Sequence, residues 1–139
     1  MNHRGHGGLV SLITHDIVAA AIEVHRRLGP GLLESAYEPC LSREFRFRQL
    51  SFACQVPLRV RYRDMEVDCG YRLDFVVGES VIVEVKAVSR ILPIHRAQVI
   101  TYLKLTNIHV GLLINFNVQM LRSGVYRIVK GRDPLRAVW

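Results

Sequence analysis

Two carboxylates and a lysine lie in neighbouring apolar segments of the sequence, with types and spacing that could do chemistry. Asp74 lies in residues 71–77, and Glu84 and Lys86 lie in residues 81–88. Glu84 and Lys86 are two residues apart, so their side chains leave the same face of an extended strand. Carboxylates beside a cation are typical of sites that bind a divalent metal and act on phosphates.

The loop between these segments sets the distance between the two carboxylates. Gly78-Glu79-Ser80 connects them, and three connecting residues that include glycine predict a β-hairpin. A loop centred on the middle residue places Asp74 directly opposite Glu84, with Cβ atoms about 4.5–5.5 Å apart. Opposed carboxylates repel each other and need a cation between them, which Lys86 or a metal ion could supply. A two-residue loop would instead place Asp74 opposite Val83 and separate the carboxylates.

The functional interpretation is a hard oxygen site for Mg²⁺ or Mn²⁺, made by Asp74, Glu84 and the backbone carbonyl of Val85. The metal would polarise a scissile phosphate and lower the pKa of a bound water. Lys86 would orient or help deprotonate that water and offset charge in the transition state. The alternative is a surface salt bridge between Glu84 and Lys86, with Asp74 capped by backbone. The apolar neighbours of Glu84 predict a central strand, where buried charges need a partner.

Two predicted helices carry further candidate site residues. Glu34 lies in the first turn of a helix expected over residues 32–49, on the same face as Tyr37. A first-turn glutamate also complements the helix dipole, which is its alternative role. Gln98 and Tyr102 are i, i+4 neighbours on another helix and could bring an amide and a hydroxyl to the bound water or phosphate. Their alternative roles are a hydrogen-bonded amide and a half-buried ring.

The elements that must position these residues predict an α/β fold. Apolar residues recur at helical spacing from about residue 9 to 28, and a Gly-Pro-Gly sequence then ends the helix. The run 109–116 is apolar enough for a strand that is buried on both faces. A mixed sheet with helices packed on it follows from the expected helices 9–28, 32–49 and 93–106 and the expected strands 56–62, 65–69, 71–77, 81–88, 109–116 and 125–130.

Length and composition predict one globular domain. The chain has 139 residues, of which 50% are hydrophobic and 22% are charged. We expect a flexible lead over residues 1–8, a single domain over residues 9–131 and a tail over residues 132–139. The apolar run 109–116 and the apolar end of the tail are compatible with a homodimer.

The charge balance indicates the class of partner. The formal net charge of +7 favours polyanions, with nucleic acid first and an anionic membrane surface second. Arg59, Arg61 and Arg63 alternate with apolar residues and predict a strand with one basic face. We assign these arginines and Lys104 as candidate contacts to DNA or RNA.

Two features predict a cytoplasmic location. The apolar stretch after residue 8 is interrupted by Asp16 and Glu23, so we expect neither a signal peptide nor a membrane span. The cysteines have no zinc spacing and are expected to be small buried hydrophobes in a reducing compartment. They are Cys40, Cys54 and Cys69.

Several motifs occur together from about residue 12 to residue 130. They are Glu23-Val-His25, Gly31-Leu-Leu-Glu34-Ser-Ala-Tyr37, Tyr71-Arg-Leu-Asp74, Val83-Glu84-Val-Lys86, Gln98-x-x-x-Tyr102-Leu-Lys104 and Gly111-Leu-Leu-Ile-Asn115-Phe116. In order and spacing they resemble the GxxExxY proteins, small bacterial and archaeal proteins assigned to the PD-(D/E)XK nuclease superfamily. The joint occurrence is specific, whereas each motif alone would be a weak signal.

The resemblance implies a restriction-endonuclease-like core, which is a mixed β-sheet flanked by helices. It implies Mg²⁺- or Mn²⁺-dependent hydrolysis of phosphodiesters in DNA or RNA. It assigns Asp74 as the signature aspartate, and Glu84 and Lys86 as the E-x-K pair. It assigns Glu34 as the first-helix glutamate near the metal. Gln98 and Tyr102 correspond to the QxxxY helix. His25 also matches a family position, and we expect it to be a core histidine bonded to backbone.

Two other functions are compatible with the same sequence. A non-catalytic nucleic-acid-binding or scaffolding protein could retain the fold, and the face of Arg59, Arg61 and Arg63 would then matter more than the hairpin. A metal-dependent reaction on a small phosphate-containing molecule would use the same carboxylates. Calorimetry with Mn²⁺ separates the first of these from an enzyme.

Overall fold

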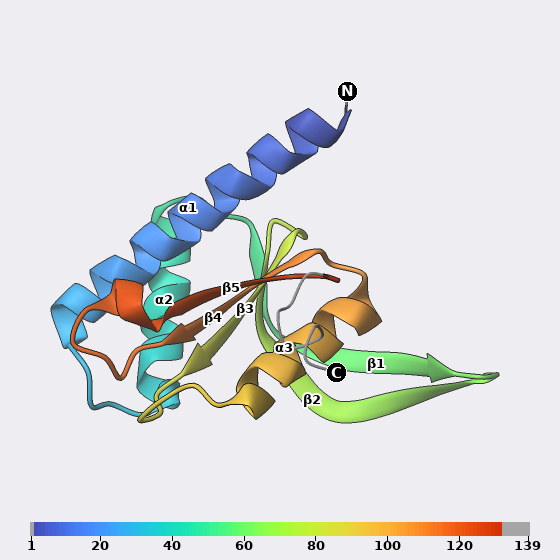
Figure 1. The fold of residues 1–139 in the computed structure, drawn as a ribbon. Coiled ribbons are helices and arrows are strands. Elements are labelled where there is room, and N and C mark those ends of the chain that lie inside the picture. Colours follow the sequence, from blue (N-terminus) through green and yellow to red (C-terminus); the bar gives the residue numbers. More distant parts are fainter. Residues whose placement is uncertain (1, 132–139) are drawn as a thin grey trace.

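A mixed five-stranded sheet forms the centre of the molecule (Figure 1). The computed structural model describes residues 2–131, with side chains from residue 8 onward. The strand order is β1-β2-β3-β4-β5, and the predicted α/β class is confirmed. The elements are α1 (Asn2–Leu28), α2 (Glu34–Phe47), β1 (Phe52–Tyr62), β2 (Met65–Val77), β3 (Val81–Lys86), α3 (Pro93–Thr106), β4 (Val110–Asn115), the 3₁₀ helix η1 (Leu121–Gly124) and β5 (Val125–Val129).

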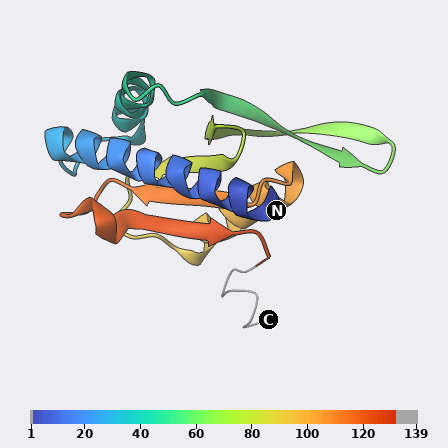
Figure 2. The same cartoon turned by 90° about the horizontal axis from the view of Figure 1, so that it is seen from above.

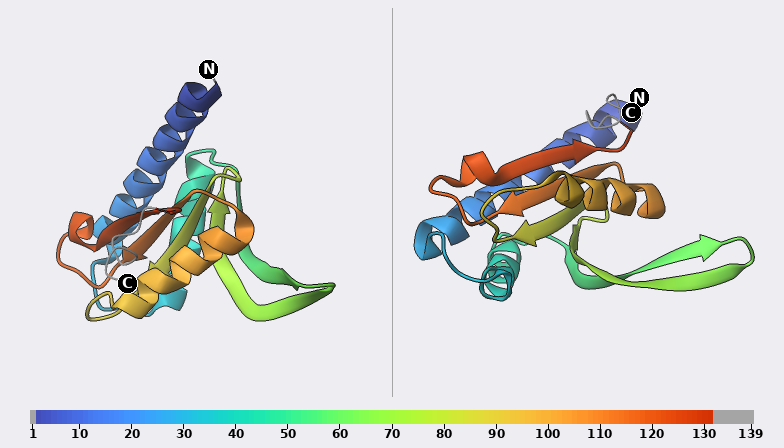
Figure 3. Two further views of the ribbon diagram at one scale, coloured as in Figure 1. Left: turned by 45° about the vertical axis from the view of Figure 1, so that its right-hand side comes forward. Right: turned by 60° about the horizontal axis from the view of Figure 1, so that its bottom comes forward.

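Helices cover both faces of the sheet (Figure 3). Alternate residues of a strand point to opposite faces, so β3 contributes to two cores. Val83 and Val85 pack in the core that contains side chains of α1 and α2, whereas Ile82 packs with side chains of α3. Glu84 and Lys86 follow Ile82 at two-residue spacing and therefore point to the α3 side.

The central strands are β3 and β4, which pair in parallel. Every residue of β4 is buried, as the apolar run 109–116 predicts. β4 also pairs with β5 on its other edge, so it has no free edge for the self-association that its apolar sequence suggests. The other apolar segment expected to support a homodimer, at the end of the tail 132–139, lies outside the described residues.

Helix α1 is longer than the sequence predicts. It begins at Asn2 and therefore includes residues 2–8, which the sequence predicts to lie before the helix. Glycine lowers helix stability but keeps its N–H donor, so the backbone ladder can extend through a glycine-rich segment. By length and composition, Gly8–Leu28 would suffice to cross a membrane, and a long core helix meets the same criterion. Ile17 and Ala20 have no exposed surface and pack in the core of the domain.

Tyr37 holds the turn between α1 and α2 against the sheet. Its hydroxyl donates to the carbonyl of Gly29 at 2.6 Å and accepts the N–H of Leu32 at 3.2 Å. Its ring stacks on Phe116 at the end of β4, with centroids 4.5 Å apart. Gly31 has φ +102°, a conformation that only glycine adopts without strain. The tyrosine therefore holds the start of α2 at the end of the central strands.

Two further motif residues form hydrogen bonds that stabilise the same end of the sheet. His25 shares a hydrogen bond of 2.8 Å with the carbonyl of Val118, which confirms its predicted role as a core histidine bonded to backbone. The buried Asn115 side chain accepts the N–H of Val88 and donates to its carbonyl, both at 3.0 Å. These bonds hold the segment that follows Lys86 against β4.

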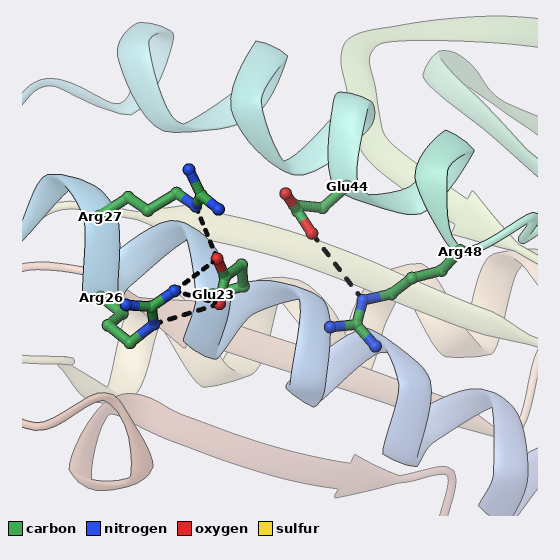
Figure 4. A network of polar contacts seen from close by, with 5 residues as sticks. All are labelled: Glu23, Arg26, Arg27, Glu44 and Arg48. Carbon is green, nitrogen blue, oxygen red and sulfur yellow. Dashed lines mark hydrogen bonds and ion pairs between the residues drawn. The ribbon is translucent and has the colours of Figure 1, made fainter.

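Several arginines on the outer surface form ion pairs with glutamates (Figure 4). Glu23 accepts hydrogen bonds from Arg26 and Arg27 one turn further along α1, and these bonds lower the pKa of its carboxyl. Arg48 approaches Glu44 to 3.9 Å at the end of α2. Exposed pairs of this kind add little stability. Their consequence here is that part of the positive charge of the chain is compensated locally.

Strands β1 and β2 form a hairpin arm that projects beyond the sheet (Figure 2). They contain 11 and 13 residues, whereas β3 contains six. The turn at residues 63–64 is confirmed, but the two strands predicted over 65–69 and 71–77 are one. Gly70 interrupts that strand with φ +75°, and its N–H donates to Asp68 at 2.9 Å. The break predicted between residues 69 and 71 is therefore an irregularity within one strand of the arm and not a loop.

Candidate active site

The site lies where β2 separates from β3. The ladder pairs Val77 with Val81 and ends at the pair Phe75 and Val83. This register confirms the three-residue loop that the sequence predicts. The next residues toward the arm are Asp74 and Glu84, as expected.

Two crossed hydrogen bonds replace the ladder at this point. The N–H of Asp74 donates to Glu84 Oε2 at 2.9 Å, and the N–H of Val85 donates to Asp74 Oδ2 at 2.8 Å. Each carboxylate is thus anchored through one oxygen to the backbone of the other strand. The second oxygens, Oδ1 and Oε1, are not used by these bonds and can accept another ligand.

The surface salt bridge that was the alternative for Glu84 is not formed. Glu84 is only 5% exposed, and in the described part of the chain no ion pair joins it to Lys86. A buried carboxylate without a paired cation is costly unless it is protonated or binds a metal. The predicted central position of Glu84 is confirmed.

The carbonyl of Val85 points into the same gap. The carbonyl of Lys86 accepts the N–H of Phe116 and so points toward β4. Neighbouring residues of a strand alternate in direction, and the N–H of Val85 indeed points toward Asp74 on β2. Since the N–H and carbonyl of one strand residue share a side, the Val85 carbonyl faces the gap between β2 and β3.

Two site residues were missed by sequence reasoning. Gln55 lies on β1 between residues that pair with Phe75 and Leu73, and it has φ 52°. Its side-chain Nε2 donates to Glu38 Oε1 of α2 at 2.8 Å, and its amide also stabilises the carboxylate of Asp74. Glu38 lies one helical turn after Glu34, so helical spacing could have identified it. Nothing local in the sequence signals the left-handed backbone of Gln55.

Burial and mutual repulsion raise the pKa values of the clustered carboxyls. Burial, followed by the charge of Asp74, raises the pKa of Glu84 to about 8. Burial also raises the pKa of Asp74, although the N–H of Val85 and the charge of Lys86 oppose this. The pKa of Glu38 rises to about 7 through burial and the charges of Asp74 and Glu34. A cation between Asp74 and Glu84 would favour the ionised forms of these carboxyls.

Of the two α3 residues predicted for the site, Tyr102 lies near the carboxylates. Tyr102 is 6% exposed, and burial together with the nearby Glu84 raises its pKa to about 12. The phenol is therefore neutral and available as a hydrogen-bond donor near the carboxylates. Gln98 lies one turn earlier and lines a cavity with Tyr102. Among the described residues, no hydrogen bond joins Gln98 to Asp74 or Glu84.

The predicted basic face carries mixed charge. Arg59 pairs with Asp68 and Arg61 pairs with Glu66 across the arm, and directly opposite residues share a face. Arg63 lies in the turn with φ 55° and approaches the ring of Tyr62. The sequence prediction missed this compensation because it considered one strand alone. Lys104 is exposed on α3, as a nucleic-acid contact would need.

The carboxylate pair fits a small hard cation only with help from other donors. In the described part of the chain, no three His, Cys, Asp or Glu side chains form a metal-binding group. Glu34, predicted as a ligand, acts on Asp74 through its charge but does not complete such a group. Mg²⁺ commonly uses one or two carboxylates and keeps several waters. Asp74, Glu84 and the Val85 carbonyl meet that requirement.

A separate hollow offers no comparable chemistry. It has a volume of about 670 Å³ and lies between the α1–α2 turn and the segment after β4. None of its lining residues is titratable, so it contains no acid, base or charged metal ligand. They are Pro30, Gly31, Asn117, Val118, Gln119, Met120 and Ser123.

Comparison with known proteins identifies the family. Residues 11–128 match the sequence profile of the PD-(D/E)XK nuclease superfamily. The chain belongs to this superfamily. No curated protein and no solved structure matches the chain significantly. PD-(D/E)XK nucleases generally use divalent metals. The assignment of the signature aspartate and E-x-K to Asp74, Glu84 and Lys86 stays a prediction from the sequence.

Membership in the PD-(D/E)XK superfamily agrees with the observed architecture. The mixed sheet with three helices is consistent with the restriction-endonuclease-like core of these nucleases. It supports a nuclease-type function with nucleic acid as the class of substrate.

Proposed function

We propose that this PD-(D/E)XK protein is a Mg²⁺- or Mn²⁺-dependent phosphodiesterase that cleaves DNA or RNA. The observation that carries the proposal is the crossed pair of hydrogen bonds at the end of the β2–β3 ladder. These bonds orient two carboxylates toward each other and leave one oxygen of each for a cation. Burial, together with repulsion between the clustered carboxylates, raises the pKa values of both carboxyls, which is unfavourable for a purely structural site.

In this proposal the chain supplies three metal ligands and, in Lys86, a positively charged side chain that does not bind the metal. Asp74, Glu84 and the Val85 carbonyl would hold the metal, which when bound would polarise the phosphate and make a water more acidic. Lys86 lies at the end of β3 and is half-buried. Its ammonium group orients the attacking water and compensates the charge that develops on the phosphate oxygens. The neutral hydroxyl of Tyr102 could donate a hydrogen bond to the same phosphate or water.

We further propose that the chain belongs to the GxxExxY group within the superfamily and acts in the cytoplasm. The structural roles of Gly31 and Tyr37 support the group, because both fix the turn that precedes the glutamate. The cysteines Cys40, Cys54 and Cys69 are free, which supports a reducing compartment. Their expected burial is wrong, because Cys54 is exposed and the other two are half-buried.

Cleavage assays on purified protein test the function. We expect metal-dependent cleavage of at least one of single-stranded DNA, duplex DNA and RNA, and none in EDTA. Lys86→Met should abolish cleavage while Mn²⁺ binding measured by calorimetry persists. Lys130→Met is the matched control, because Lys130 donates to Asn107, the residue that caps the C-terminus of α3. Cleavage that persists in Lys86→Met would contradict the proposed site. Nucleic-acid binding without any Mn²⁺ binding would favour a non-catalytic role.

Glu38 is expected to strengthen metal binding from outside the ligand set. Glu38→Gln keeps an acceptor for Gln55 but removes one negative charge beside Asp74. We expect Mn²⁺ affinity to fall by roughly tenfold or more, as for other residues that support metal ligands. Glu44→Gln on the same helix is the control, since Glu44 pairs with Arg48. Equal Mn²⁺ affinities of the two variants, measured by calorimetry, would assign Glu38 a structural role only.

A further inference from the structure

A cavity lies between the base of the hairpin arm and α3. Its volume is about 300 Å³, at the lower end of the range for small-ligand sites. The arm contributes apolar and aromatic side chains, and α3 contributes an amide and a hydroxyl among apolar groups. The residues that matter here are Leu58, Tyr71, Ile94, Gln98, Thr101 and Tyr102.

Two tyrosine rings define the entrance and the floor of this cavity. Tyr102 is buried, whereas Tyr71 on the arm is 55% exposed. Their centroids are 6.4 Å apart and the rings are inclined by 51°, so the face of Tyr71 is not covered by Tyr102. An exposed aromatic face beside an apolar cavity is the arrangement on which proteins stack unpaired bases.

The cavity adjoins the carboxylate site. Tyr102 lines the cavity from α3, and Glu84 points to the α3 side of the sheet. Tyr71 precedes Asp74 by three residues on β2, which is about 10 Å along a strand. A ligand group in the cavity would therefore be next to any group that is bound between the carboxylates.

An exposed cation flanks the cavity and suits a phosphate-linked chain. Lys104 lies three residues after Thr101, on the same side of α3. Its charge complements the backbone of a nucleic acid whose base enters the cavity. Arg72 is also exposed, but strand alternation places it on the other face of β2 from Tyr71.

We propose that this cavity binds the base of an unpaired nucleotide next to the scissile phosphate. The base stacks on Tyr71, and its edge bonds with the amide of Gln98 and the hydroxyl of Thr101. A paired base in a duplex is not available for such a cavity unless it is flipped out. The inference rests on the proposed function and specifies its substrate as single-stranded or locally unpaired nucleic acid.

Binding measurements without metal test the cavity separately from cleavage. The probe is a fluorescent oligothymidylate, compared by anisotropy in EDTA with a base-free phosphodiester chain of equal length and charge. We expect the oligothymidylate to bind more tightly than the base-free chain and than a duplex of the same length. Tyr71→Ala should weaken oligothymidylate binding by roughly tenfold and leave the base-free chain unaffected. Tyr71→Phe should retain wild-type binding, since stacking needs only the ring.

Tyr62→Ala is the matched control, because Tyr62 is 58% exposed on the same arm but outside the cavity. The inference is overturned if the base-free chain or the duplex binds as tightly as the oligothymidylate. It is also overturned if Tyr71→Ala and Tyr62→Ala behave alike. Loss of cleavage with intact base-dependent binding would instead contradict the proposed enzyme and leave the cavity assignment standing.

Discussion

Glu84→Gln is expected to abolish metal-dependent cleavage without unfolding the protein. The glutamine oxygen can still accept the N–H of Asp74, which is the anchoring bond of the wild-type carboxylate. The charge that would hold the metal is lost. Since a bound metal contributes several kcal/mol to stabilising the transition state, we expect a rate loss of roughly a thousandfold or more.

The control for this variant is Glu79→Gln in the loop of the same hairpin. Glu79 is exposed and lies away from the ladder end where the two carboxylates meet. Glu79→Gln should cleave at the wild-type rate and bind Mn²⁺ normally. Glu84→Gln should lose Mn²⁺ binding in calorimetry together with cleavage. Full activity of Glu84→Gln would exclude this carboxylate from the reaction and contradict the proposed function.

The second large effect is a loss of stability of the metal-free protein as the pH rises. The pKa of Glu84 is about 8 in the folded protein, above the ordinary value of 4.5. Between these values the folded state binds more protons than the unfolded state, so the free energy of unfolding falls with increasing pH. The contribution is fully present below about pH 4.5 and is lost as the pH rises through about 8. Asp74 and Glu38 act in the same direction.

Urea unfolding in EDTA from about pH 5 to about pH 9 measures this effect. We expect the free energy of unfolding to fall by a few kcal/mol, because a tenfold change in a protonation equilibrium corresponds to about 1.4 kcal/mol. Glu84→Gln should flatten the curve and make the metal-free protein more stable than wild type at the alkaline end. Parallel curves for the two proteins would show that Glu84 is ionised throughout.

Addition of Mn²⁺ should reverse the trend. Metal binding requires ionised carboxylates, so the stabilisation by Mn²⁺ should grow as the pH rises. In Glu84→Gln the metal should have little effect at any pH. This comparison separates a metal site from a buried acid that is merely protonated.

The local parts of the site could be predicted from the sequence. Gly78-Glu79-Ser80 determined the register of the hairpin, because a short loop leaves few ways to pair the flanking strands. The position of Asp74 and Glu84 just beyond the last ladder pair followed from that register. The third helix was predicted with its observed limits, Pro93–Thr106, because proline suits a helix start.

Effects that depend on contacts between distant segments could not be predicted. The approach of Glu38 to Asp74 depends on the contacts of Tyr37, which hold α2 at the end of β4. The compensation of Arg59 by Asp68 depends on strand pairing across the arm. The length of α1 was also underestimated, since its glycine-rich start reads as irregular by propensity.

The sequence alone therefore determined the two carboxylates, the lysine beside them and the strands that carry them, because hairpin pairing and side-chain alternation operate over a few residues. The separation of β2 from β3, the left-handed backbone at Gln55 and the cavity beside Tyr71 arise only when the arm packs against α2 and α3. Burial raises the pKa values of Glu84 and Glu38 for the same reason, because desolvation is a property of the assembled domain and not of the chain order.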